Sequence, residues 1–178
     1  LRGGKGYYGD NAVKIGIVWD NGVSKWMAQM FEPLADISGA DTTLFVGEKN
    51  KYDVNGISLR MQRLTHREEI LLGAARPAES LGRLVNAPFK KMDFYYNSLG
   101  KYLEGMDVVE SSEASRSLYT VASLKRRGMR FKLIMSCAEN IPYRQVFDDK
   151  SIYVKRSCYG AVDHFIPWAR VPMNAIEN

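Results

Sequence analysis

Residues 14–20, KIGIVWD, are the stretch that decides the fold of this chain. A short, continuous apolar run of this kind is typical of a strand that is buried on both faces of a parallel sheet. It is followed by the turn residues Asn21 and Gly22 and then by apolar side chains at helical spacing over residues 26–35. Because a strand that leads directly into a helix is the beginning of a β-α-β unit, we expect a parallel sheet.

The rest of the chain repeats this alternation. We predict further strands at residues 42–46, 57–61, 106–110, 131–137 and 162–166, and helices at 93–103, at 113–127 and within 146–159. Strands that alternate with helices favour a Rossmann-like, doubly wound α/β fold, with a mostly parallel sheet of about six strands and helices on both faces. Pro33 predicts a kink or an end in the first helix. Residues 64–89 show no clear period, and we expect a mobile loop region there.

The length of 178 residues favours one domain. We expect residues 13–178 to form a single Rossmann-like domain. Residues 1–12 are rich in glycine and have no apolar period, which indicates a flexible lead-in or a tag. Apolar residues make up 46% of the chain and charged residues 25%, as in an ordinary globular protein rather than a disordered one.

The charge and the cysteine count exclude several classes of protein. A net charge of +5 is modest, so we expect an ordinary surface and no nucleic-acid partner; the alternative is a basic patch that contacts anionic lipid head groups or phosphates. The two cysteines, Cys137 and Cys158, predict buried thiols rather than a disulfide framework, and two histidines offer no metal site. No apolar stretch is long enough to span a membrane. We therefore expect a cytoplasmic protein, with the inner face of the membrane as a second location.

Ligands of doubly wound sheets bind at the carboxyl ends of the strands, so the residues that follow each strand are the candidates for chemistry. Asn21 and Gly22 follow the first strand, where the N-terminus of the next helix suits a phosphate or another anion. The alternative is a plain turn. A G-x-G-x-x-G dinucleotide fingerprint and a P-loop motif are both absent from the sequence.

The segment after the fourth strand, residues 110–116 (ESSEASR), gathers two carboxylates and three hydroxyls, which suit a hydroxyl-rich ligand such as a sugar. Ser112 and Glu113 are its candidate binding residues. The alternative is that Ser111 or Ser112 caps the next helix and that Glu113 lies in its first turn. After the fifth strand, Glu139 and Asn140 precede Ile141-Pro142 and form a second candidate site. Glu139 and Glu113 are the candidate catalytic residues.

These segments together resemble the N-terminal domain of GT-B glycosyltransferases, in particular the retaining family 4. The resemblance rests on MDVVE at residues 106–110, on Ser-Glu-Ala-Ser at 112–115, on FKLIMSCAENIP at 131–142 and on VDHFI at 162–166. The opening strand and turn, residues 14–22, fit the same domain. The match extends over most of residues 13–168.

This resemblance implies one half of a hexosyltransferase. The domain would bind a sugar or lipid-linked acceptor and form one wall of the cleft. A C-terminal domain, missing here, would hold the nucleotide-sugar donor, so the isolated chain would be inactive and would need neither a covalent cofactor nor a metal. Asn21 and Gly22 would approach the donor phosphates, and Ser112, Glu113, Glu139 and Asn140 would bind substrate in the cleft. Many relatives carry a histidine at the end of the fifth strand, where this chain has Cys-Ala-Glu-Asn, so the resemblance assigns no catalytic base.

Two other functions are compatible with an α/β domain of this size. The first is a stand-alone ligand-binding or regulatory module without catalysis. A receiver-like version would need acidic residues after the first and third strands, and only Asp20 fits. The second is a small hydrolase, against which the absence of a G-x-S-x-G motif argues.

Overall fold

The structure is a computed structural model of the chain. It describes residues 12–19, 22–37, 39–48, 50–65, 96, 98–113, 115, 117–137 and 156–167. The predicted lead-in lies outside these ranges except for Ala12, and so does the predicted loop region after Thr65.

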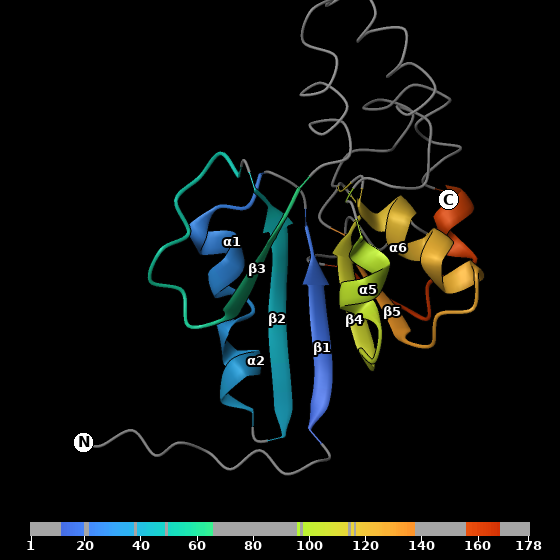
Figure 1. The fold of residues 1–178 in the computed structure, drawn as a ribbon, viewed down its shortest axis with the longest axis horizontal. Helices are drawn as coiled ribbons and strands as arrows, with labels where there is room; N and C mark the ends of the chain where they lie inside the picture. The colour runs from blue at the N-terminus through green and yellow to red at the C-terminus, as the bar shows by residue number, and fades with distance from the viewer. Residues whose placement is uncertain are drawn as a thin grey trace, which may run out of the picture.

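Six strands form one sheet in which every neighbouring pair is parallel, in the order β3-β2-β1-β4-β5-β6. The strands are β1 (Val13–Val18), β2 (Ala40–Gly47), β3 (Arg60–Leu64), β4 (Val108–Ser112), β5 (Lys132–Cys137) and β6 (His164–Pro167). Figure 1 shows the central strands side by side with their arrows in the same direction. The Rossmann-like α/β fold that the sequence predicts is therefore confirmed.

Two apolar cores lie on opposite faces of this sheet, because successive side chains of a strand point to opposite sides. On one face, Ile17 and Leu44 pack with α1 (Lys25–Gln29) and α2 (Glu32–Asp36). On the other face, their neighbours in the chain, Val18 and Phe45, belong to the core that holds α5 (Leu99–Leu103) and α6 (Ser117–Arg126). The doubly wound arrangement follows from this division, which Figure 1 shows as α1 and α2 beside β2 and β3 and as α5 and α6 beside β4 and β5.

Several element boundaries differ from the prediction. The first predicted helix is interrupted at Met30 and Phe31, and Pro33 lies in the first turn of α2, where a proline needs no hydrogen-bond partner. The third strand begins at Arg60 rather than Ile57, because Ile57 and Leu59 pack against the core formed with α1 and α2 without joining the ladder. β4 runs two residues further than predicted and includes both serines that were the alternative helix caps, so the capping interpretation is wrong.

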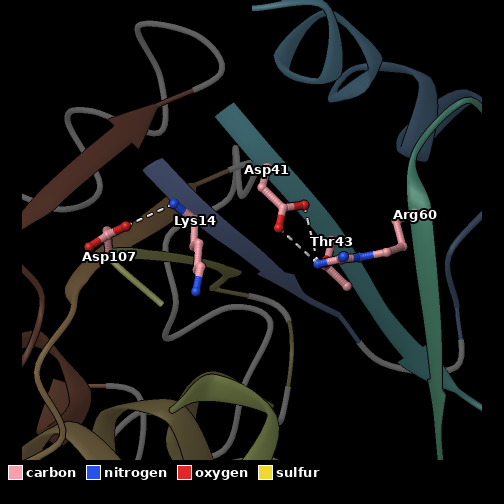
Figure 2. Close-up of polar contacts among 5 residues, drawn as sticks. All are labelled: Lys14, Asp41, Thr43, Arg60 and Asp107. Carbon is pink, nitrogen blue, oxygen red and sulfur yellow. Dashed lines mark hydrogen bonds and ion pairs between the residues drawn. The ribbon is translucent and has the colours of Figure 1, made fainter. Parts of the chain in front are cut away.

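Polar contacts fix the strands at the amino ends of the sheet. Asp107 Oδ2 accepts a hydrogen bond from the Lys14 amide at 2.8 Å, which ties the start of β1 to the residue before β4 (Figure 2). Arg60 donates from Nε to Thr43 Oγ1 at 2.8 Å and pairs with the Asp41 carboxylate at 3.2 Å, which ties the edge strand β3 to β2. None of the helices in the described ranges has the length and apolar character that crossing a lipid bilayer requires.

Candidate functional site

The candidate site lies where β1 and β4 run side by side. The chain builds the sheet from β1 outward through β2 to β3 and then returns to place β4 on the other side of β1. In doubly wound sheets this reversal of strand order leaves a crevice at the carboxyl ends of the two central strands, and ligands bind there. In this chain the reversal brings Trp19, which follows β1, next to the last three residues of β4.

Glu110 is the unusual residue at this position. It lies within β4 opposite Ile17 of β1 and Ile134 of β5, and only 6% of its surface is exposed. The Trp19 indole donates a hydrogen bond from Nε1 to Glu110 Oε2 at 2.7 Å. A carboxyl group at the centre of a sheet is costly to bury unless it is neutral or well partnered, so its presence requires an explanation.

The protonation state of Glu110 follows from this burial. Loss of solvation raises its pKa from 4.5 to about 7, against the weaker, opposite effects of Ser136 and of the Trp19 indole. Burial dominates because it disfavours the charged carboxylate, whereas the two neutral donors stabilise it. Glu110 therefore changes charge close to neutral pH.

The hydrogen-bonding capacity of this cluster is incompletely used. Within the described part of the chain, Glu110 Oε1 and the Ser136 hydroxyl are both buried and make no hydrogen bond. Ser136 is close enough to lower the pKa of Glu110, but its geometry is not that of a hydrogen bond. Buried polar atoms are nearly always satisfied in native proteins, so two unsatisfied atoms beneath the strand ends indicate a place for an additional donor or acceptor.

Hydroxyl groups hold the end of β1 in position. The Val18 carbonyl accepts hydrogen bonds from Ser111 Oγ at 2.9 Å and from Ser117 Oγ at 3.2 Å. The Tyr96 hydroxyl donates to the next carbonyl, that of Trp19. These three donors come from β4, from α6 and from the segment before α5, so the backbone that presents Trp19 to Glu110 is fixed from several sides.

The structure places two of the predicted site residues at the carboxyl ends of β4 and β5. Ser112 is the last residue of β4 and pairs with Ser136 of β5, and both Ser112 and Glu113 are buried. The Glu113 amide donates to the Ser136 carbonyl at 2.9 Å. Glu113 therefore lies between the ends of β4 and β5, while a role for Ser112 and Glu113 in binding stays a prediction.

Of the other predicted site residues, the structure describes Gly22 alone. Asn21, Glu139 and Asn140 lie outside the described residues. Gly22 is exposed in a turn, and a Cβ atom at this position would have no neighbour within 4 Å. The amide of the next residue, Val23, donates to the Asn50 side chain at 3.0 Å, so this backbone donor at the start of α1 is already occupied.

Sequence reasoning missed Trp19, Glu110 and Ser136 as a cluster. Glu110 was counted among the polar residues after the fourth strand, but its partner Trp19 is 91 residues away in the chain. The sequence feature that could have indicated this cluster is a glutamate that directly follows the apolar residues of a strand expected to be buried. Among the described residues, no group of three or more histidine, cysteine, aspartate or glutamate side chains is placed to hold a metal ion.

Comparison with known proteins identifies no family for this chain. No protein-family model and no curated protein matches the sequence. Solved structures that align with the chain include the TubZ protein of Clostridium botulinum phage c-st, at 8% identity and a TM-score of 0.38, over 85% of this chain and 47% of TubZ. A form of the same TubZ that lacks its C-terminal tail aligns at 8% identity and a TM-score of 0.40, over 85% and 48% of the two chains. The phage tubulin PhuZ in a GDP-containing structure aligns at 12% identity and a TM-score of 0.34, over 88% and 49%.

The chain spans about half the length of these structures, and likeness at this level supports no conclusion about activity. The comparisons do correct the interpretation as a glycosyltransferase. The three structures named above are phage tubulins and TubZ proteins rather than GT-B enzymes, and no family model or curated protein supports family 4. The assignments as a glycosyltransferase N-terminal domain and as a hexosyltransferase that uses a nucleotide sugar are therefore wrong. The resemblance was carried by strand and turn patterns that many doubly wound folds share.

Proposed function

We propose that this domain is a binding module for a small ligand that carries N–H or O–H donors, held at the carboxyl ends of β1, β4 and β5. The observation that supports the proposal is the buried Glu110 Oε1, which has no hydrogen-bond partner among the described residues. A ligand hydroxyl or ammonium group that donates to this oxygen would remove the cost of leaving it unsatisfied. The Ser136 hydroxyl, also unsatisfied, lies on the next strand and can orient the same group.

The charge of Glu110 favours donors over anions as ligands. Its pKa of about 7 means that part of the population is ionised at neutral pH, and an ammonium group would stabilise that form. An anionic ligand would meet Glu110 and Glu113 at the same strand ends. We place the module in the cytoplasm, which the two buried thiols, Cys137 and Cys158, support because such thiols persist in a reducing compartment.

The Trp19 indole N–H is a direct reporter of this site, because it donates to Glu110. Its proton resonance would be followed by NMR during titration with ethanolamine, glycerol and adenosine as donor-bearing probes and with acetate as an anionic control. We expect at least one donor-bearing probe to shift the Trp19 resonance, and acetate to leave it unchanged. The Trp19→Phe variant identifies the resonance among those of the three tryptophans of the chain.

The matched variant is Glu110→Gln, which keeps an oxygen that can accept from Trp19 and removes the charge. It should abolish the response to ethanolamine. If no donor-bearing probe shifts Trp19, or if acetate shifts it as strongly, a donor-binding site at these strand ends is refuted.

A further inference from the structure

A concentration of positive charge lies at the amino ends of the strands, opposite the candidate ligand site. Residues 125–132, KRRGMRFK, contain five basic side chains and no acidic one. They form the last turn of α6, the loop after it and the first residue of β5. Because α6 runs antiparallel to the strands it connects, this segment lies at the amino ends of the strands, away from Glu110 and Trp19 at the carboxyl ends.

The fold adds neighbours to this basic segment. Arg126 donates from Nη1 to the Ser157 carbonyl at 2.8 Å, which places the exposed Arg156 next to the last turn of α6. Two acidic residues, Asp107 and Asp163, directly precede β4 and β6. The Lys132 amide donates a hydrogen bond to the Asp107 carbonyl at 2.8 Å. The Leu133 amide donates to Asp163 Oδ2 at 2.6 Å. The surface thus holds six basic side chains, with two acidic residues on the adjoining strand starts.

The acidic residues neutralise only part of this charge. Lys125 forms a close ion pair with Asp163. Lys132 approaches Asp163 Oδ1 at 3.7 Å but keeps 69% of its side chain exposed. Arg130 is exposed as well. Arg130 and Lys132 therefore present their charge to whatever approaches this edge.

The surface here has a shallow, open hollow. Lys125, Arg130 and Lys132 line a hollow of about 440 Å³ together with Met129, Phe131 and the two aspartates. Its lining combines three cationic side chains, two carboxylates and two apolar side chains. This combination suits a single phosphate-bearing head group with its glycerol backbone better than a row of evenly spaced phosphates.

We propose that the surface formed by residues 125–132 and Arg156 docks the domain onto a membrane rich in anionic phospholipid. Each Lys or Arg close to a membrane surface is attracted by anionic lipids, so a surface with six basic side chains suits such a contact. The basic surface and the candidate ligand site lie at opposite ends of the same strands, so a docked domain keeps its ligand site open to solution. This inference is independent of the proposed ligand-binding function.

The test is co-sedimentation of the 178-residue chain with vesicles. Phosphatidylcholine vesicles with about a third phosphatidylserine should bind the chain, and vesicles of phosphatidylcholine alone should not. Binding should weaken strongly when the salt concentration rises toward 1 M, because the charges on both surfaces are then screened. Equal binding to both vesicle types, or none to either, overturns the proposal.

Two double variants with the same change of charge separate this surface from the overall charge of the chain. Arg130→Gln with Lys132→Gln should lower partitioning onto phosphatidylserine vesicles by about fivefold for each charge removed. Lys25→Gln with Lys51→Gln removes two exposed charges near α1 and should have little effect. Circular dichroism confirms that both variants fold. If the two variants lose affinity equally, or if a DNA duplex competes away the vesicles and binds more tightly, the membrane assignment is wrong.

Discussion

At the scale of single residues, the cluster of Trp19, Glu110 and Ser136 joins stability to chemistry. Glu110 is retained in the middle of a central strand although burial makes its ionised form costly. The indole donor offsets part of that cost from one side, and Oε1 is left without a partner in the described part of the chain. A residue of this kind lowers stability unless something else binds it, and this is the reason to regard it as functional.

Glu110→Gln should change how stability depends on pH. The pKa is raised on folding, so the native state holds the proton between pH 4.5 and about 7, and the free energy of unfolding of the wild type falls over that interval. The loss amounts to about 3 kcal/mol at most. The glutamine variant has no proton to lose and should show no such fall. Urea denaturation at several pH values measures the free energy of unfolding of the wild type and of the variant.

Asp163 does not interfere with this measurement. Burial opposes its ionisation, but the Lys125 ammonium, the Leu133 amide and the charge of Lys132 together lower its pKa below 3.8. Its contribution to stability is complete above that value and is lost only at more acidic pH. Parallel curves for the wild type and Glu110→Gln above pH 5 would show that Glu110 does not titrate there.

At the scale of secondary structure elements, β1 is held closely against α5. A Cβ atom on Gly16 would lie 3.2 Å from Phe45 Cε2 and 3.5 Å from Leu103 Cδ2. The strand can therefore carry no side chain at this position without moving its neighbours, which explains a glycine inside a buried strand.

Gly16→Val should destabilise the protein by about 1–3 kcal/mol, because the added methyl groups overpack the core against Phe45 and Leu103. The matched change is Gly22→Val, at a position with open space around it, and it should alter stability by about 0.5 kcal/mol or less. Chemical denaturation of both variants gives the comparison. Equal effects would mean that β1 and α5 are not in close contact.

The elements also show what the sequence could and could not predict. β1 and β5 were predicted to within about two residues, because continuous apolar runs leave little choice for a buried strand. The third strand was misplaced because Leu59 is buried in the core and Ile57 packs against it, and neither pairs with a neighbouring strand. The end of β4 was misjudged because Ser111 satisfies a carbonyl of β1 that is 93 residues away, and no local pattern reports such a bond.

At the scale of the whole molecule, the strand order divides the sheet into a protected centre and two edges. β1 and β4 have hydrogen-bonded neighbours on both sides, whereas β6, among the described strands, pairs only with β5. Three of the four residues of β6 are exposed, including Phe165 and Ile166. The edges of the sheet should therefore open locally without unfolding the centre.

Hydrogen exchange should reveal this order. Amides of β4 should exchange only through global unfolding, and those of β6 should exchange much faster, through local opening. Exchange followed by mass spectrometry of peptides that contain residues 108–112 and 164–167 gives the comparison. Similar protection in both strands would show that β6 is covered by another part of the molecule or by a partner.

The strand order has one more consequence. Residues 13–64 supply β1, β2 and β3, and residues 108–167 supply β4, β5 and β6, so each half of the sheet comes from a continuous piece of chain. Among the described strands, the two pieces meet in the sheet only along β1 and β4. If the chain were divided into these two pieces, the seam at which Trp19 meets Glu110 would be the surface through which the separate fragments recognise each other.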